Sequence, residues 1–255
     1  MNRKLLIFLV VILGIATAGG VFWFVKGVTQ KPTTTTGSQK QDVLRELPLA
    51  ERPFAFLTPR TDGHEFKLAV SKIPAGTDAL EYELVYKNSD GVTQGVPGSV
   101  KLKGATTLER NLLLGSCSSG KCKYDEGVEK GTLTLRVRDS DGKLISKLET
   151  GFHLQQGGPL SSADGNFKFT SSSLSAKTFY LTMGTFGLPA QTGLPVSAPG
   201  EVSAGPYGVF TSGKTSVSGT VSLGSGKVYG WSGGKWTLLL DGKTSFLGTF
   251  IGASE

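Results

Sequence analysis

The N-terminal part of the chain contains an uncharged apolar run that is long enough to cross a lipid bilayer. As a helix, the 21 residues from Leu5 to Val25 would measure about 31 Å, close to the ~30 Å hydrocarbon core of a membrane. Arg3 and Lys4 precede the run, and aromatic residues occupy its far end at Phe22–Phe24. Basic residues before a span favour the cytoplasmic side. We therefore expect a single-pass cell-membrane protein with residues 1–4 in the cytoplasm and its bulk outside.

A cleaved signal peptide is the competing interpretation of the same run. Ala16–Ala18 fits the small-residue cleavage pattern that follows an apolar core, here Leu5 to Leu13. The run continues through Val21 to Val25 beyond that point, so we favour a retained anchor, and cleavage after Ala18 stays open. The absence of a cysteine after the run argues against a lipoprotein. In both interpretations the rest of the chain is exported.

Residues 26–50 have the composition of a stalk. The stretch Lys31–Gln41, KPTTTTGSQKQ, is rich in threonine and lacks apolar periodicity. The first 50 residues carry six Lys and Arg against two Asp and Glu, whereas residues 51–156 carry 15 against 14 and residues 157–255 carry six against four. More than half of the net charge of +7 therefore lies beside the anchor. We expect the lipid bilayer, and not nucleic acid, to be the partner of this basic segment.

Residues 51–156 alternate apolar and polar side chains in the manner of β-strands. Apolar residues share one face at Phe66–Val70, Leu80–Tyr86 and Leu133–Val137. Asp-Gly dipeptides at positions 62–63, 90–91 and 141–142 predict hairpin turns. About seven strands in about 100 residues is the spacing of an immunoglobulin-like or fibronectin-III-like β-sandwich. We predict an all-β protein whose first folded domain is this sandwich.

A second β domain is predicted at residues 167–255, after a linker at residues 157–166. Glycine is concentrated in residues 157–255, which contain 19 of the 36 glycines. The clearest element is a hairpin over residues 227–240, in which a turn at Gly233–Gly234 would pair Trp231 with Trp236. We expect the aromatic face of this hairpin to be covered and Trp236 to be core, with Trp231 partly exposed. A long loop is expected from Gly184 to Pro206.

An aromatic ligand platform is the alternative interpretation of this region. Its candidate residues are Tyr207, Tyr229, Trp231 and Trp236. Aromatic rings of this kind stack on sugars when they are exposed. Exposure of the rings distinguishes the two interpretations.

The two cysteines of the chain, Cys117 and Cys122, are separated by four residues. A structural zinc ion requires four ligands, and the two histidines, His64 and His153, lie far away in sequence, so no metal site is predicted. In an exported chain we expect the cysteines to close a small disulfide loop between strands. Free thiols are the alternative, and redox activity is not expected because thioredoxin-like motifs have two intervening residues.

No catalytic set is apparent in the sequence. Neither histidine has an evident nucleophile nearby, and the Asp139–Gly142 segment fails the spacing of an EF-hand calcium loop, so it is interpreted as a hairpin turn. Acidic residues on one predicted strand face basic residues on another and are expected to form cross-strand ion pairs, with a peptide-binding charge strip as the alternative. These residues are Glu81 and Glu83, and Arg136 and Arg138. We expect no cofactor.

The layout resembles single-pass, membrane-anchored bacterial surface proteins with extracytoplasmic immunoglobulin-like β-sandwich modules. The resemblance rests on the segment Leu114–Val128 and on the C-terminal pattern from Gly230–Trp231 through Trp236 to Leu247–Phe250. It implies architecture and no activity. We therefore expect a non-catalytic surface module for adhesion, ligand binding or envelope assembly, with a surface glycan or another envelope protein as partner. An envelope hydrolase with carboxylate catalysis and a structural subunit of a membrane complex are the alternatives.

The predicted topology can be tested by proteolysis of intact cells. Protease added outside should release a fragment that begins within residues 29–50, because the stalk is expected to be extracytoplasmic. The fragment can be identified by N-terminal sequencing. Protection of the whole chain until the cells are lysed would show the opposite orientation.

Overall fold

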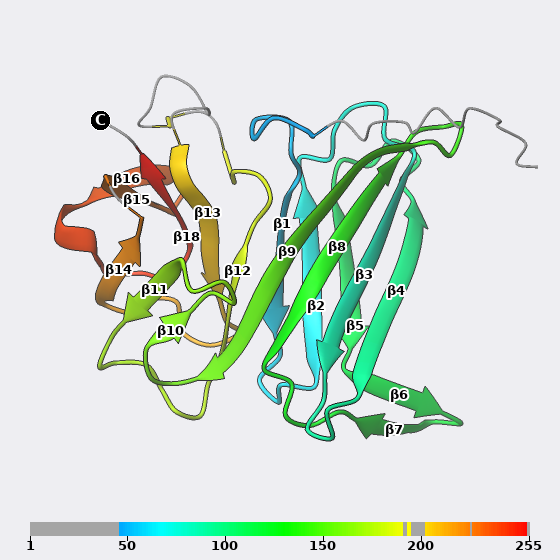
Figure 1. The fold of residues 1–255 in the computed structure, drawn as a ribbon, viewed down its shortest axis with the longest axis horizontal. Coiled ribbons are helices and arrows are strands. Elements are labelled where there is room, and N and C mark those ends of the chain that lie inside the picture. The colour runs from blue at the N-terminus through cyan, green and yellow to red at the C-terminus, as the bar shows by residue number, and fades with distance from the viewer. Residues whose placement is uncertain (1–45, 191–192, 195–201, 225, 254–255) are drawn as a thin grey trace, which may run out of the picture. The chain divides into compact units, whose positions relative to one another are not determined.

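The computed structural model describes residues 46–190, 193–194, 202–224 and 226–253, and this part of the chain is all-β (Figure 1). The predicted tip at residues 1–4, the predicted span at residues 5–25 and nearly all of the predicted stalk lie outside these ranges. Within them, no helix has the length and apolar character needed to cross a membrane. The helical element that is described is one 3-10 turn, η2 (Leu240–Gly242).

The described strands form four antiparallel sheets. The largest has nine strands in the order β16-β15-β18-β13-β12-β9-β8-β3-β4. These strands are β3 (Ala79–Lys87), β4 (Thr93–Lys101), β8 (Lys130–Arg138), β9 (Leu144–Gln156), β12 (Phe179–Gly184), β13 (Val202–Phe210), β15 (Lys227–Ser232), β16 (Lys235–Leu239) and β18 (Thr249–Ala253).

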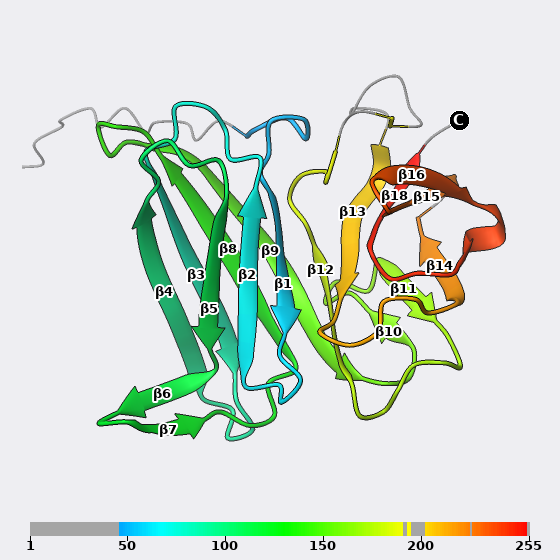
Figure 2. The same cartoon turned by 180° about the vertical axis from the view of Figure 1, so that it is seen from behind.

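Three smaller sheets complete the fold (Figure 2). The first contains β1 (Phe54–Pro59), β2 (Glu65–Ser71) and β5 (Leu108–Leu113). The second contains β10 (Leu160–Ser161), β11 (Phe167–Thr170), β14 (Gly219–Leu223) and β17 (Lys243–Thr244). The third is the hairpin of β6 (Gly115–Ser118) and β7 (Lys121–Tyr124).

The three Asp-Gly dipeptides of residues 51–156 stand in hairpin turns, as predicted. Gly63 joins β1 to β2, Gly91 joins β3 to β4, and Gly142 joins β8 to β9. Their φ angles are 75°, 74° and 74°, a conformation that glycine adopts without the steric cost of a Cβ atom. These turns set the antiparallel register of the first half of the fold.

The first hydrophobic core lies between the three-stranded sheet and one face of the large sheet. Leu80, Leu84 and Leu133 are fully buried and alternate with polar residues along β3 and β8, as the period-two pattern predicted. They pack in one cluster with buried residues of β1, β2 and β5. The Phe66 and Phe152 rings meet edge to face across this core, with centroids 5.4 Å apart.

A second core covers the opposite face of the large sheet. Phe167 and Phe169 of β11 pack in a cluster with Tyr180 of β12. The next residue of β12, Leu181, belongs to the first core. Because successive side chains of a strand point to opposite faces, the two small sheets cover opposite faces of the large one.

The large sheet continues across the predicted boundary between the two halves of the chain. β9 pairs with β8 on one side and with β12 on the other. The segment predicted as a linker, residues 157–166, includes β10, where Leu160 is fully buried in the second core. The division into domains at residues 51–156 and 167–255 stays a prediction.

Two glycines in the large sheet provide a matched test of this packing. A Cβ atom on Gly131 of β8 would lie 2.2 Å from the Val85 carbonyl oxygen and 2.5 Å from the Phe152 ring, whereas one on Gly95 of β4 would have no atom within 4 Å. We expect Gly131→Ala to lower the free energy of unfolding by about 1–3 kcal/mol or more. Gly95→Ala should leave it unchanged or slightly higher, because alanine restricts the unfolded chain. Chemical denaturation measures both, and equal effects would contradict the packing.

Candidate functional site

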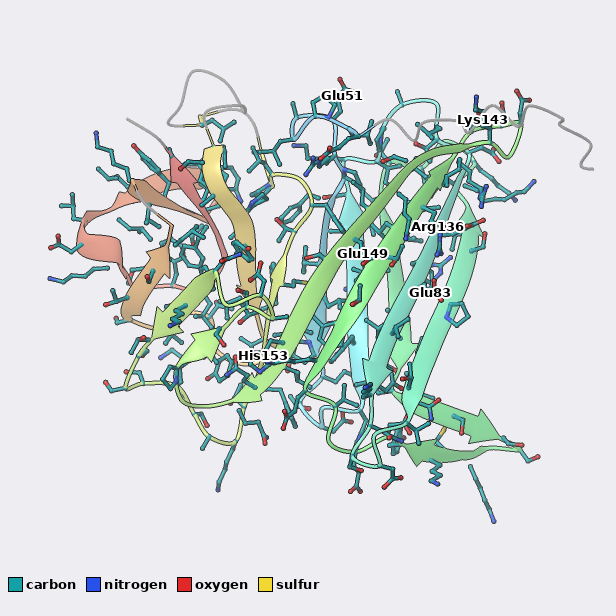
Figure 3. All side chains as sticks on the ribbon, in the orientation of Figure 1. Glu51, Glu83, Arg136, Lys143, Glu149 and His153 are labelled. Atoms are coloured by element: carbon teal, nitrogen blue, oxygen red, sulfur yellow. A yellow bond between two sulfur atoms is a disulfide. The ribbon has the colours of Figure 1, made fainter. Side chains whose placement is uncertain are left out.

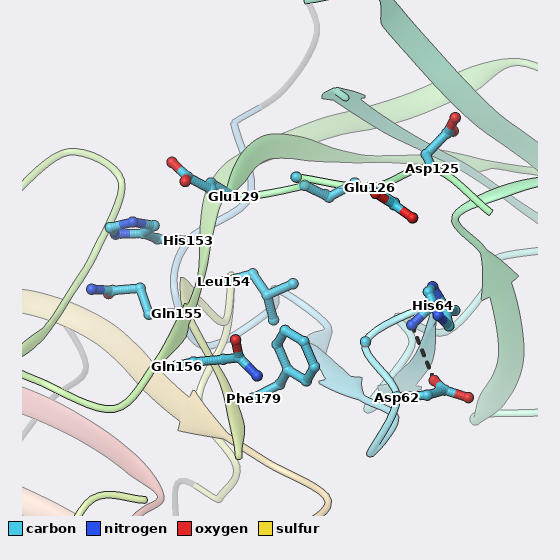
Figure 4. Close-up of a pocket in the computed structure, with 13 residues that line it drawn as sticks. Asp62, His64, Asp125, Glu126, Glu129, His153, Leu154, Gln155, Gln156 and Phe179 are labelled. Atoms are coloured by element: carbon cyan, nitrogen blue, oxygen red, sulfur yellow. Dashed lines mark hydrogen bonds between the residues drawn. The ribbon is translucent and has the colours of Figure 1, made fainter. Parts of the chain in front are cut away.

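An open cleft lies where the β1–β2 turn, the segment after β7 and the end of β9 meet. We call it the acidic cleft, and its volume is about 570 Å³ (Figure 4). Its charged lining consists of Asp62, Asp125, Glu126 and Glu129, and its lining includes no Lys or Arg. Leu154 and Phe179 add apolar surface. The cleft therefore combines negative charge with an apolar wall.

Both histidines also line the acidic cleft. His64 stacks on Tyr124, with ring centroids 4.3 Å apart. Burial lowers the pKa of His153, although its contact with the Ser161 carbonyl acts in the opposite direction. The neutral imidazole of His153 is therefore favoured near pH 7.

The contact between His153 and Ser161 is not arranged as a nucleophile and its base. The Ser161 hydroxyl lies 3.3 Å from Nδ1 of His153, but the Ser161 carbonyl oxygen lies closer, at 2.9 Å from the same nitrogen. A carbonyl oxygen only accepts hydrogen bonds, so Nδ1 must carry the proton to make this bond. A protonated Nδ1 has no lone pair with which to take the serine proton.

A smaller cleft, of about 290 Å³, is lined by Asp164, Tyr207, Glu149 and Arg52. The Tyr207 hydroxyl donates to Asp164 Oδ2 at 2.5 Å, and the Ser162 hydroxyl donates to Asp164 Oδ1 at the same distance. Partial burial opposes ionisation of Asp164, but these hydrogen bonds and those from Asn166 outweigh it and lower the pKa. Burial, followed by the Asp164 contact, raises the pKa of Tyr207 to about 12.

The other charged groups of the smaller cleft also have protein partners. Glu149 of β9 pairs with Lys147 at 3.4 Å and accepts from the Thr134 hydroxyl at 3.4 Å. Arg52 pairs with Glu46 at 2.8 Å and donates to the Leu47 carbonyl at 2.7 Å. Glu149 and Asp164 thus share one cleft, but Asp164 holds its proton too weakly to serve as a general acid near pH 7.

The four predicted platform residues do not form one surface. Tyr207 of β13 pairs with Phe250 of β18, which pairs in turn with Gly230 of β15. Paired residues of antiparallel strands share a face, so Tyr207 lies on the face of Gly230. The neighbours of Gly230 along β15, Tyr229 and Trp231, must lie on the other face.

Tyr229, Trp231 and Trp236 form an aromatic surface on the β15–β16 hairpin. The Gly233–Gly234 turn and the pairing of Trp231 with Trp236 are confirmed. The two indole rings are 5.3 Å apart, and all three aromatic side chains are half-buried. Beside them, Leu238 and Leu240 are 41% and 73% exposed.

The expected core position of Trp236 is wrong. β16 is the edge strand of the large sheet, and Trp236 is only half-buried there, with its indole nitrogen donating to the Ala190 carbonyl at 3.3 Å. The buried residue of β16 is Leu239, which points to the opposite face. The two-residue turn correctly predicted the register of the β15–β16 hairpin. Which face of the hairpin is buried depends on packing against a sheet whose strands lie elsewhere in the sequence.

Cys117 and Cys122 form a disulfide, as predicted. The bond ties β6 to β7 at a directly opposed pair of residues, so the expected small loop is a hairpin. We call this hairpin, residues 115–124, the disulfide arm. All its residues are exposed except the half-buried Gly115.

The predicted cross-strand charges are ion pairs. Arg136 contacts Glu83 at 2.9 Å, a pair labelled in Figure 3, and Arg138 contacts Glu81 at 2.6 Å. All four side chains are partly exposed, so each pair contributes little to stability. These four charged side chains therefore lie on a sheet face that contacts water.

Cation ligands do not gather anywhere in the described ranges, because no three His, Cys, Asp or Glu side chains there could hold one metal ion. In the segment Asp139–Gly142, which is interpreted as a hairpin turn and not as a calcium loop, Asp139 accepts hydrogen bonds from the backbone nitrogens of Asp141 and Lys143. These bonds close the β8–β9 turn.

Sequence reasoning did not identify the two clefts. The acidic residues at positions 125–129 are visible in the sequence, but their neighbours Asp62 and His153 come from distant turns and strands. The same holds for Asp164 and Tyr207, which are 43 residues apart. No local spacing connects such residues.

Comparisons with protein-family models, with curated proteins and with solved structures gave no match.

The Tyr207–Asp164 contact can be tested by titration. The folded-state pKa of Tyr207, about 12, is above its ordinary value of 10.0, so the stabilisation is complete below pH 10 and is lost as the pH rises through 12. Asp164→Asn should lower the pKa of Tyr207 but not restore the ordinary value, because burial remains. Phenolate absorbance measures this after subtraction of the Tyr207→Phe titration. An unchanged pKa in Asp164→Asn would contradict the contact.

Proposed function

We propose that the protein is a non-catalytic, membrane-anchored cell-surface module that binds a surface glycan through the aromatic surface of the β15–β16 hairpin. The observation that carries the proposal is the partial exposure of Tyr229, Trp231 and Trp236 on one face of an edge hairpin. A sugar ring presents apolar C–H faces and polar edges. Aromatic side chains that keep an open ring face complement the former.

Polar groups around the aromatic surface suit the edges of a sugar. Lys227 lies two residues before Tyr229 on β15, so its exposed side chain shares the aromatic face, and Tyr229 itself carries a hydroxyl group. Hydroxyl and ammonium groups donate to or accept from sugar hydroxyls. Leu238, which pairs with Tyr229, extends the apolar area on the same face, as expected for a binding surface with an apolar centre and a polar rim.

We further propose the architecture in which this surface is presented. An N-terminal transmembrane helix at residues 5–25 and a Thr-rich stalk at residues 26–50 would precede two β-sandwiches, the first of them immunoglobulin-like. The length and flanking charge of the apolar run support the anchor. The two separate hydrophobic cores support two sandwich units that share the large sheet.

The absence of a role in catalysis is also part of the proposal. The Ser161–His153 contact lacks a free base nitrogen, and Asp164 accepts three side-chain hydrogen bonds that hold it as a carboxylate. A non-catalytic module accounts for polar groups that bond to one another.

An envelope hydrolase is the second candidate, because Glu149 and Asp164 line the same cleft. Pairs of carboxylates in one cleft cleave glycosidic bonds. Hydrolysis of isolated envelope polysaccharide by the full-length protein, abolished by both Glu149→Gln and Asp164→Asn, would favour this candidate. Absence of hydrolysis by the wild-type protein would favour the non-catalytic binding module over the hydrolase.

Binding to purified envelope polysaccharide tests the main proposal. The full-length protein in detergent should bind, and Trp231→Ala should weaken binding about tenfold or more, as expected when a central aromatic side chain is removed. Val92→Ala is the control, because this exposed aliphatic residue lies in the β3–β4 turn and outside the aromatic surface. Both variants should keep a melting temperature within a few degrees of the wild type. Wild-type affinity in Trp231→Ala would exclude the aromatic surface as the binding site.

A further inference from the structure

The disulfide arm projects from the body of the fold without packing on it. Figures 1 and 2 show β6 and β7 extending outward past the ends of β4 and β5. No residue of the arm belongs to either hydrophobic core. Its contacts with the body lie at its base, where Tyr124 stacks on His64 and the Gly115 backbone hydrogen-bonds to the Tyr86 side chain. The arm therefore adds little to the stability of the fold, while its disulfide restricts its own conformation.

The arm carries two lysines and no other charge. Lys121 and Lys123 are exposed, and neither forms an ion pair within the described residues. Both lie on β7 two residues apart, so their side chains share one face of the hairpin. The arm thus presents a pair of neighbouring cations on a braced support.

The acidic cleft carries the charge that complements such a hairpin. Glu126 and Glu129 are exposed and, like the arm lysines, have no ion-pair partner in the part of the chain that the structure describes. Figure 4 shows Glu126 and Glu129 on one side of the cleft, with Leu154 and Phe179 across from them. The aliphatic stem of a lysine can lie on the half-buried Phe179 ring while its ammonium group reaches the carboxylates.

We propose that two copies of the chain associate by placing the disulfide arm of each into the acidic cleft of the other. Arm and cleft lie at the same end of the fold, where Asp125 directly follows the arm in the chain. A twofold axis therefore allows both contacts to form at once, which is the arrangement that closes a dimer. We assign a second copy as the occupant because the arm supplies two lysines that, within the described residues, are unpaired and complement the unpaired glutamates of the cleft.

The proposed dimer is held by opposite charges on the arm and in the cleft, so added salt should weaken it. Four carboxylates in the cleft meet two ammonium groups on the arm, and each contact is made twice in the dimer. Pairs of exposed charges are screened when the Debye length falls from about 20 Å at low salt to a few Å at high salt. The inference does not depend on the proposed glycan binding, because the aromatic surface is made by different elements.

Sedimentation of the full-length protein in detergent tests the proposal. A reversible dimer is expected at about 0.02 M salt, with the dimer dissociation constant at least tenfold higher at about 0.5 M salt. Lys121→Glu/Lys123→Glu should raise that constant at least tenfold at low salt. Lys101→Glu/Lys103→Glu is the matched control, because these two exposed lysines on and after β4 make the same change of charge elsewhere. The control should dimerise like the wild type.

A charge exchange distinguishes a direct contact from a general effect of charge. Glu126→Lys/Glu129→Lys should also weaken the dimer. An equimolar mixture with Lys121→Glu/Lys123→Glu should recover it in part, since both arm–cleft contacts of the mixed dimer then pair opposite charges, while Asp62 and Asp125 remain in each cleft. Carbodiimide coupling of isotope-labelled with unlabelled chains should yield intermolecular links from Lys121 or Lys123 to Glu126 or Glu129. A monomer at low salt, or unchanged dimerisation in Lys121→Glu/Lys123→Glu, would overturn the proposal. Polysaccharide binding should be unaffected in these variants.

Discussion

Continuous hydrogen bonding through β9 and β12 holds the two halves of the fold in one sheet. β9 has 13 residues, and it pairs over most of its length with β8 and at its end with β12. β12 then has to be covered on both faces, and four of its six residues are buried. One small sheet supplies the cover on each face. The two cores therefore depend on this single connection.

Because the two small sheets cover opposite faces of the large sheet, each half of the large sheet keeps one face without a partner sheet. Over β3 and β8 the open face carries the Arg136–Glu83 and Arg138–Glu81 pairs, which suit water. Over β15 and β16 the face without a partner sheet carries the aromatic surface, whose half-buried rings leave part of an apolar area exposed. Exposed apolar areas of this kind mark binding sites. The same architecture that creates both faces thus assigns a different chemistry to each.

The clefts arise at the ends of strands, where turns from distant parts of the chain meet. Each polar group in the smaller cleft bonds to another group of the protein, which reduces what is left for a ligand. The acidic cleft differs, because Glu126 and Glu129 have no cationic partner there. Unpaired carboxylates at an open surface favour the binding of a positively charged partner.

The sequence by itself determined the features that depend on neighbouring residues: the strands, the Asp-Gly turns, the register of the Trp231–Trp236 hairpin and the disulfide of Cys117 and Cys122. Local backbone preference and the alternation of side chains suffice for these. Only the tertiary structure decided that β9 pairs with β12, which faces are covered, and that Trp236 lies at an edge. Sheet order and coverage arise from contacts between residues far apart in the chain, and alternation along one strand separates its two faces without showing which one a distant sheet will bury.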